Sequence, residues 1–334
     1  MRLKWISAAL LATLAATAGA QNLTGAGATF PNPIYSRWFS EYSSSHPGVQ
    51  INYQSVGSGA GIRQVSSKTV DFGASDGPMT DQQLAESKIK LFHFPTVLGA
   101  VVPVYNVPGV GTDLKFSPDV IADIYLLKIT NWHDPRIAKD NPGVNLPDHL
   151  ILPVYRSEGS GTTYIFTDFL SKVSPEFQSK IGRGTAVHWP GGVGQKGNEG
   201  VAGMVRNSPY TFGYVELIYA VQNKMSYGEV KNAAGKFVKA SVDGVTAAAA
   251  SMTKMPDDFR VSITNAPGAT SYPISSFTWL LVPIKSDDPA KGKVIHDFLQ
   301  WMLDHGESEA ADMTYAPLPK SVVDKLRGAL NYIH

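Results

Sequence analysis

The sequence predicts an α/β fold with two lobes, and three observations lead to this prediction. The chain has 334 residues, which is more than one ordinary domain holds and enough for two. Strand and helix patterns alternate along its length, as in sheets that helices cover on both faces. Two long apolar β segments, Val97 to Val107 and Ser276 to Ile284, are well placed to connect the lobes. We therefore expect a first lobe of residues 21–98 and 272–334, and a second of residues 99–271.

Shorter patterns predict the individual elements. Residues Val49 to Tyr53 alternate between apolar and polar, which is typical of a half-buried strand. Residues Thr69 to Ala74 are predicted to form the next strand. Residues Ser117 to Leu127 have a helical pattern, with Ser117 as the expected N-cap and Pro118 at the first helical position.

The first twenty residues have the pattern of a secretory signal peptide. Arg2 and Lys4 precede an apolar stretch from Trp5 to Ala16, and Ala18-Gly19-Ala20 matches a cleavage site with small residues. Cleavage after Ala20 is therefore expected. The alternative is a membrane anchor, but this apolar stretch is short for a bilayer span.

Charge and cysteine content restrict the function further. Removal of Arg2 and Lys4 lowers Lys plus Arg from 29 to 27 against 28 Asp plus Glu, which gives a net charge of about −1. Such a chain has no bulk attraction for nucleic acid or anionic lipid. The chain has no cysteine, which excludes a thiol nucleophile and a cysteine-linked lipid anchor. We expect a protein free in solution in the periplasm.

Four short segments share a pattern of small residues and a hydroxyl group at or before a turn or helix start. The first amides of a helix lack an intrahelical acceptor, and the helix dipole adds partial positive charge there. Glycines let an anion approach these amides. One such turn is usually only a turn, but four of them with one arginine indicate an oxyanion site. The segments are Gly25–Phe30, Gly57–Gly61, Gly73–Gly77 and Arg156–Thr162.

Two charged side chains in these segments suggest which anion binds. The guanidinium of Arg156 can bind two oxygens of one anion, and Glu158 is near enough in sequence to pair with it and orient it. Asp76 would repel an anion unless the anion carries a proton, in which case the carboxylate can accept a hydrogen bond from the protonated oxygen. Phosphate carries such a proton at neutral pH, whereas sulfate does not. The alternative is that Asp76 only caps the following turn.

Signals for catalysis and for metal or cofactor binding are weak. None of the eight histidines lies two or four residues from another, so a local metal motif is absent from the sequence. Gly73–Gly77 matches the G-x-S-x-G motif of hydrolases, which requires a helix directly after the serine. Thr80 followed by Gln83 instead predicts a later helix start with a capping box. We expect no catalytic residues, metal or cofactor.

At these residues the chain resembles the periplasmic phosphate-binding proteins of ABC importers. The resemblance covers essentially all of the chain after the signal segment, and its motifs are specific when taken together. They are Leu23–Pro31, Thr69–Asp76, Arg156 with Gly159–Thr162, Asn131–Pro135, Asn141–Gly143, Trp189–Gly192, Gly197–Gly200 and Leu318–Val323.

The resemblance implies a two-lobed type II periplasmic binding-protein fold with a ligand cleft and a hinge between the lobes. It implies inorganic phosphate as the ligand, permease subunits of an inner-membrane ABC transporter as partners, and a monomer. Glu158 is expected to steady the arginine, although family members often have Asp at this position. A secreted phosphatase and a receptor for another oxyanion such as sulfate stay as alternatives. The implied phosphate ligands are Thr29, Phe30, Ser58, Asp76, Arg156, Ser160, Gly161 and Thr162.

Overall fold

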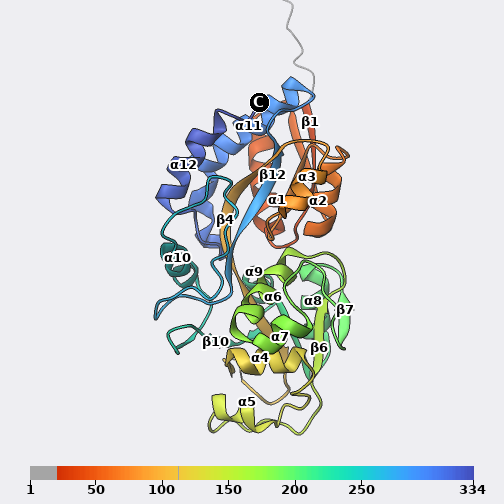
Figure 1. Cartoon of the computed structure of the whole chain (residues 1–334), viewed down its shortest axis with the longest axis vertical. Coiled ribbons are helices and arrows are strands. Elements are labelled where there is room, and N and C mark those ends of the chain that lie inside the picture. The colour runs from red at the N-terminus through yellow and green to blue at the C-terminus, as the bar shows by residue number, and fades with distance from the viewer. Residues whose placement is uncertain (1–20, 112) are drawn as a thin grey trace, which may run out of the picture.

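One long strand, β4 (Leu91–Asn106), runs from one lobe of the molecule into the other (Figure 1). The computed structural model describes residues 21–111 and 113–334, so the predicted signal segment lies outside the described residues. The first part of β4 pairs antiparallel with β12 (Ser275–Pro283), and its last six residues pair antiparallel with β8 (Thr211–Glu216). The same strand thus belongs to the sheets of both lobes.

Nine strands form one sheet, eight of them in the order β2-β1-β3-β12-β4-β8-β6-β7, and the ninth, β9, pairs with β4. β1 is parallel to both β2 and β3, and β6 is parallel to β7 and β8. The remaining strands form a small sheet in the order β11-β10-β5. The bounds not yet given are β1 (Gln21–Gly27), β2 (Val49–Ser55), β3 (Phe72–Ser75), β5 (Lys115–Phe116), β6 (Leu152–Arg156), β7 (Val193–Gln195), β9 (Ser226–Tyr227), β10 (Glu229–Lys231) and β11 (Phe237–Val238).

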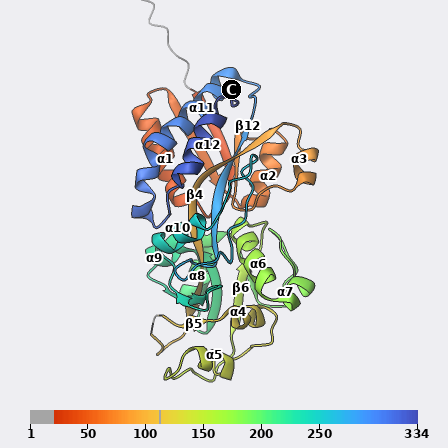
Figure 2. The same ribbon diagram turned by 60° about the vertical axis from the view of Figure 1, so that its left-hand side comes forward.

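Helices cover the strands of each lobe. Figure 2 shows α1, α11 and α12 on one side of the strands of lobe I, and α2 and α3 on the other. The helices of lobe I are α1 (Asn32–Ser45), α2 (Ser58–Ser66), α3 (Asp81–Glu86), α11 (Pro289–Asp304) and α12 (Lys320–Leu330), with the short 3₁₀ helices η1 (Gly306–Glu309) and η2 (Ala311–Met313). The other helices are α4 (Pro118–Tyr125), α5 (Pro135–Asp140), α6 (Gly161–Val173), α7 (Pro175–Lys180), α8 (Gly197–Asn207), α9 (Leu217–Gln222) and α10 (Val242–Ala250).

Aromatic residues fill the core of each lobe. In lobe I, the ring of Phe39 packs against Phe72 and Phe298, with centroid distances of 5.6 and 5.1 Å. In lobe II, the rings of Phe166 and Tyr214 are stacked at 4.2 Å. Each lobe thus packs aromatic rings from its own helices and strands against its part of the sheet.

A β-bulge interrupts the pairing of the two central strands. Thr278 of β12 lies opposite Val97, but the next residue, Trp279, lies opposite Pro95, so Thr96 is the extra residue on β4. Pro95 has no N–H to donate to the ladder, and prolines inside sheets concentrate at such irregularities. The hydroxyl of Thr96 instead bonds to Thr278 O at 3.3 Å.

Most of the predicted elements are present, with shifted ends. The predicted Thr69 strand begins only at Phe72, and the predicted Val97 strand begins at Leu91. The predicted helix of residues 117–127 ends at Tyr125, because Leu127 adopts a left-handed conformation with φ of 57°.

Helix caps were predicted with mixed success. Ser117 is the N-cap residue of α4 and Pro118 its first residue, as predicted, but the Ser117 side chain makes no capping hydrogen bond. Instead, the backbone N–H of Ser117 donates to Asp140 Oδ2. The capping box of Thr80 and Gln83 is confirmed at the start of α3, so no helix follows Ser75 directly. In the described part of the chain, no helix is long and apolar enough to cross a membrane.

Candidate functional site

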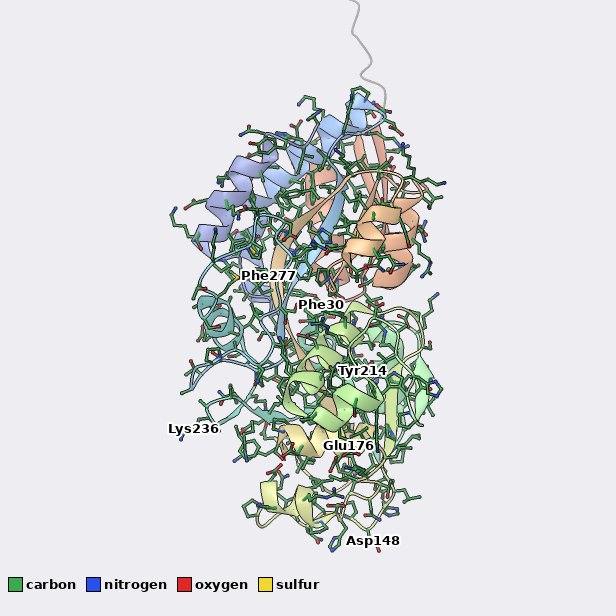
Figure 3. All side chains as sticks on the ribbon, in the orientation of Figure 1. Phe30, Asp148, Glu176, Tyr214, Lys236 and Phe277 are labelled. Atoms are coloured by element: carbon green, nitrogen blue, oxygen red, sulfur yellow. The ribbon has the colours of Figure 1, made fainter. Side chains whose placement is uncertain are left out.

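The N-terminal ends of helices from both lobes meet where the lobes touch. From lobe I come the start of α2 and the turn before α1, and from lobe II the starts of α6 and α8. In Figure 3, Phe30 lies at this junction, and Tyr214 lies in the lobe below it. Converging helix starts direct several backbone amides to one place, which favours a negatively charged group there.

Ser58 connects the two lobes at the first turn of α2. It is fully buried, and its Oγ accepts hydrogen bonds from the amides of Asp76 at 3.2 Å and Gly161 at 3.0 Å. The preceding Gly57 has φ of 94°, and a Cβ there would lie 2.8 Å from Gly159 O. This position therefore needs glycine, both for its left-handed backbone and for the close approach of the other lobe.

Asp76 follows the end of β3 and is 1% exposed. Its Oδ1 accepts a hydrogen bond from Thr278 Oγ1 at 2.8 Å, whereas its Oδ2 has no hydrogen-bond partner among the described residues. Burial raises the pKa of Asp76 to about 7, while the hydroxyl of Thr278, the charge of Arg156 and the hydroxyl of Ser58 oppose that rise. A buried carboxylate oxygen without a partner is costly, so this atom is suited to a ligand that donates a hydrogen bond.

Gly161 is the first residue of α6 and lies directly against the lobe I side of the site. A Cβ at this position would lie 2.4 Å from Asp76 Oδ2 and 2.5 Å from Ser58 Oγ. Any side chain here would push the lobes apart. The absent Cβ thus allows the start of α6 to reach the buried carboxylate.

Arg156, at the end of β6, has a side chain that is 1% exposed. Its Nε donates to Glu158 Oε1 at 3.0 Å, and one terminal nitrogen also donates to that oxygen. The other terminal nitrogen donates to Thr162 Oγ1 at 3.2 Å. Glu158 Oε1 also accepts from the amide of Gly197 at 3.0 Å. Glu158 therefore contacts both the arginine and the start of α8.

Thr29 is linked to the opposite lobe through Asn198. The hydroxyl of Thr29 accepts from the side-chain amide of Asn198 at 2.8 Å and from its backbone amide at 3.2 Å. The same side chain of Asn198 also donates to Thr162 Oγ1 at 3.1 Å. Tyr219 donates to the carbonyl of Thr29 at 2.6 Å. The hydroxyls of Thr29 and Thr162, both predicted ligands from opposite lobes, thus accept hydrogen bonds from the same side-chain amide of Asn198.

Two of the predicted residues have side chains engaged elsewhere. The ring of Phe30 is fully buried and packs 6.2 Å from the ring of Tyr315, which donates to Phe30 O at 2.6 Å. Ser160 caps α6, since its Oγ accepts from the amide of Thr163 at 3.1 Å. Phe30 anchors the turn before α1, and Ser160 fixes the start of α6.

The sequence predictions missed three residues that contact the predicted ones, Asn198, Thr278 and Tyr219, and a fourth, Glu216, that contacts Asn198. Asn198 was part of a recognised motif, and its place at a glycine-flanked helix start was an available signal. Thr278 and Tyr219 lie in apolar segments, where nothing marks a hydroxyl that reaches the site. Glu216 is fully buried at the end of β8, its Oε1 has no partner among the described residues, and burial raises the pKa of Glu216 well above its usual range.

Within residues 21–111 and 113–334, no group of three or more histidine or acidic side chains could hold a metal ion. The charged groups of the site are instead one arginine and the two carboxylates next to it, Asp76 and Glu158. Together with hydroxyls and amides, they form a hydrogen-bonding site that contains charges of both signs.

Comparison with known sequences identifies the family. A family model described as the PBP superfamily domain matches residues 12–305. The phosphate-binding protein PstS of Pasteurella multocida is 45% identical over 322 residues, which cover 96% of this chain and 93% of the relative. This chain belongs to the PstS family. The PstS proteins of Xylella fastidiosa strain Temecula1 and Haemophilus influenzae are 44% and 42% identical and cover 91% and 93% of this chain, and the chain covers 83% and 92% of them.

Solved structures show the same fold at lower sequence identity. The high-affinity periplasmic phosphate-binding protein PfluDING, solved with phosphate, has a TM-score of 0.74 and 22% identity, and covers 92% of this chain and 93% of its own. An ABC-type phosphate transport receptor from Vibrio cholerae has a TM-score of 0.59 and 18% identity, with coverages of 89% and 100%. The predicted two-lobed α/β fold of periplasmic binding proteins is therefore confirmed for this PstS-family chain.

Proposed function

We propose that this PstS-family chain binds inorganic phosphate between its two lobes and delivers it to an ABC-type importer. The observation that carries this proposal is the buried Asp76 Oδ2, which accepts no hydrogen bond from residues 21–111 or 113–334 and lies beside Gly161 at the start of α6. An anion that still carries a proton satisfies both neighbours, because its hydroxyl donates to Oδ2 while its other oxygens accept from the amides. Phosphate is such an anion at neutral pH.

The proposed ligand set extends from this pair of residues. Arg156 supplies the positive charge, and Glu158 orients its guanidinium. In the structure, the hydroxyl of Ser58 accepts from the amide of Gly161, and the hydroxyls of Thr29 and Thr162 accept from Asn198. Phosphate oxygens can replace these hydroxyls as acceptors, which frees the hydroxyls to donate to phosphate. Backbone amides of Phe30 and Gly161 and the hydroxyl of Ser160 complete the proposed set.

The hydrogen bonds of the proposed ligand set can supply enough binding free energy for a receptor. Each hydrogen bond to a charged group contributes about 1.5–3 kcal/mol before ordering costs. Micromolar affinity requires about −8 kcal/mol, so a few well-formed bonds of this kind are enough. Because the site residues are buried, closure of the lobes also removes competing water.

Calorimetry with phosphate and with sulfate at pH 7 tests the proposal. We expect phosphate to bind with micromolar affinity or better and sulfate at least about 1000-fold more weakly, since sulfate leaves the carboxylate unsatisfied. Equal affinity for both anions would contradict the role proposed for Asp76. A folded protein that binds neither anion would contradict the function as a whole.

A phosphatase is the alternative from a different class, and the serines of the site do not favour it. Ser58 Oγ bonds to two backbone amides, Ser75 Oγ to the carbonyl and amide of Gly77, and Ser160 Oγ to the amide of Thr163. PstS relatives are binding proteins, and we conclude that this chain is one as well, not an enzyme. Release of phosphate from a chromogenic phosphoester above background would count against this conclusion.

The cellular setting of the protein follows from the same function. We propose that it is periplasmic after cleavage at Ala20, monomeric, and read by permease subunits of the importer in its closed form. The hinge in this proposal lies where β4 passes from β12 to β8, near the predicted lobe boundaries at residues 98 and 272. Size-exclusion chromatography with light scattering tests the monomer, and mass spectrometry of the exported protein tests the cleavage site.

A further inference from the structure

Between α10 and β12 lies a loop that contacts both lobes, residues 255–264, which we name the bridging loop. On the lobe I side, Trp279 Nε1 donates to Phe259 O at 2.9 Å. On the lobe II side, Ser262 Oγ donates at 2.5 Å to Asp168, a residue of α6 that is 1% exposed. The loop is therefore anchored to β12 on the lobe I side and to α6 on the lobe II side.

Arg260, in the middle of the bridging loop, reaches the turn that follows Asp76. One terminal nitrogen of its guanidinium donates to Met79 O at 2.8 Å. Its Nε donates to Asp258 Oδ2 at 2.8 Å, and its own amide donates to Asp258 Oδ1 at 3.1 Å. An ion pair with Asp81 at 2.8 Å completes its contacts, but the side chain of Asp81 is 91% exposed and adds little. The guanidinium thus ties a buried carbonyl to a carboxylate of its own loop.

Residues 76–79 have no strand partner, and side chains hold them in place. The amide of Met79 donates to His93 Nε2 at 3.0 Å. Burial lowers the pKa of His93 to about 4, so its ring is neutral and this nitrogen can accept. On the other side, a Cβ on Gly77 would lie 2.8 Å from the ring of Tyr164. The turn therefore packs between β4, α6 and the bridging loop, and Arg260 is the residue of the loop that bonds to it.

We propose that Arg260 is a positioning residue for Asp76, which holds residues 76–79 so that the free carboxylate oxygen faces the bound oxyanion. This inference rests on the proposed function, because it assigns a role in phosphate recognition. It assigns this role to a side chain that contacts residues near the site without being one of the proposed ligands. The same loop also contacts the opposite lobe, through the hydrogen bond from Ser262 to Asp168 on α6.

Lys325 of α12 provides a matched control, because it holds the same loop without contacting the turn. Its Nζ donates to the carbonyls of Met255 and Pro256 at 2.8 and 2.9 Å and lies 5.2 Å from the centre of the Phe259 ring. Lys325→Gln therefore loosens the bridging loop at its start, whereas Arg260→Gln removes the bond to the turn after Asp76. Both variants remove one positive charge.

The first measurement compares the two variants by calorimetry with phosphate at pH 7. We expect Arg260→Gln to weaken binding about tenfold, which is the effect of losing one charge-assisted hydrogen bond near the site. We expect Lys325→Gln to stay within about twofold of the unchanged protein. Circular dichroism and thermal unfolding verify that both variants are folded. Equal losses in the two variants, or no loss in Arg260→Gln, overturn the proposal.

The second measurement separates positioning of Asp76 from a general effect on closure. Arg260→Gln is combined with Asp76→Asn in a double-mutant cycle, and weak binding is followed by NMR titration with millimolar phosphate. If Arg260 acts through Asp76, its tenfold effect falls below about twofold in the Asp76→Asn background. The same tenfold loss in both backgrounds overturns the proposal. Failure of the proposed function is recognisable separately, because the unchanged protein then binds no phosphate.

Discussion

The two walls of the site differ in chemistry, although both are built from turns at helix starts. The lobe I wall mainly accepts hydrogen bonds, through the hydroxyls of Thr29 and Ser58 and the carboxylate of Asp76. The lobe II wall mainly donates them, through the guanidinium of Arg156 and the amides of Gly161 and Asn198. Lobe II alone would therefore bind oxyanions without selectivity, and lobe I alone would offer an anion few hydrogen-bond donors.

This difference suggests a division of labour between the lobes. A donor wall attracts oxyanions in general, because sulfate and phosphate present the same tetrahedral oxygens. An acceptor wall admits only an oxyanion that brings its own proton. On this view lobe II provides most of the affinity and lobe I most of the selectivity, and both act only when the lobes are closed. The predictions below test this division.

Removal of the charge from the donor wall should have the largest effect. Arg156→Gln should weaken phosphate binding about 1000-fold, since two charge-assisted hydrogen bonds of about 1.5–3 kcal/mol each are lost. Calorimetry measures the change. Arg136→Gln is the matched control, because Arg136 is an exposed lobe II arginine paired with Asp123 and Asp134, and its loss should change affinity less than twofold. A loss below tenfold in Arg156→Gln would show that lobe II does not dominate affinity.

The pH dependence of stability tests the burial of the acceptor wall. Because the pKa of Asp76 is about 7 when folded and closed, against 3.8 when unfolded, the folded protein holds a proton between these values that the unfolded chain has released. Stability of the phosphate-free protein should therefore fall as pH rises from about 4 to 7, by up to about 4 kcal/mol. Asp76→Asn should lack this part of the fall. Thermal unfolding of both proteins across this range measures it, and identical profiles would show that Asp76 is solvated without ligand.

Contact between the walls can be blocked at a single glycine. Gly161→Ala should weaken phosphate binding about 100-fold, because the added Cβ would lie 2.4 Å from Asp76 Oδ2 and hold the lobes apart. Gly203→Ala in α8 is the control, since a Cβ there meets no atom within 4 Å. Calorimetry and small-angle scattering with saturating phosphate measure affinity and closure. A Gly161→Ala protein that closes and binds as the control does would contradict this packing.

The acceptor wall should determine selectivity more than affinity. Asp76→Asn should weaken phosphate binding about 30-fold and reduce the preference for phosphate over sulfate by a larger factor, because the neutral amide no longer repels sulfate. Competition calorimetry with both anions at pH 7 gives the two values. An unchanged preference would assign selectivity to another part of the site.

The smallest expected effect concerns the orientation of the arginine. Glu158→Gln should weaken phosphate binding about fivefold, because the guanidinium keeps its charge but loses its charged partner. Glu158→Asp is the informative comparison, since it retains the charge on a shorter side chain. If Glu158→Asp binds as tightly as the unchanged protein, charge rather than reach matters at this position. Calorimetry at pH 7 distinguishes these outcomes.

Sequence reasoning predicted the turns of the site because their signals are local. Gly57 with Ser58 and Arg156 with Gly161 each lie within a few residues of a helix start, so composition alone marks them. Thr278 is different, because its bond to Asp76 depends on pairing between segments 202 residues apart and on the bulge at Thr96. No pattern in an apolar strand reveals which residue a bulge will direct into a site.

The ends of the elements were harder to predict for a related reason. β4 begins six residues before its predicted start because β12 continues to pair with it as far as Leu91. Asn198 lay in a motif that was noticed, but its reach to Thr29 requires both lobes to be in place. Tertiary pairing, rather than local preference, decided these features.

The order of strands in lobe I also constrains how the chain folds as it is made. β12 lies between β3 and β4 in the sheet, yet its residues come from near the end of the chain. Until residue 283 has been synthesised, β3 and β4 have no strand between them, and the backbone edges that pair with β12 stay without a partner. The lobe whose residues are made first therefore completes its sheet last, only after the continuous residues of lobe II have been made.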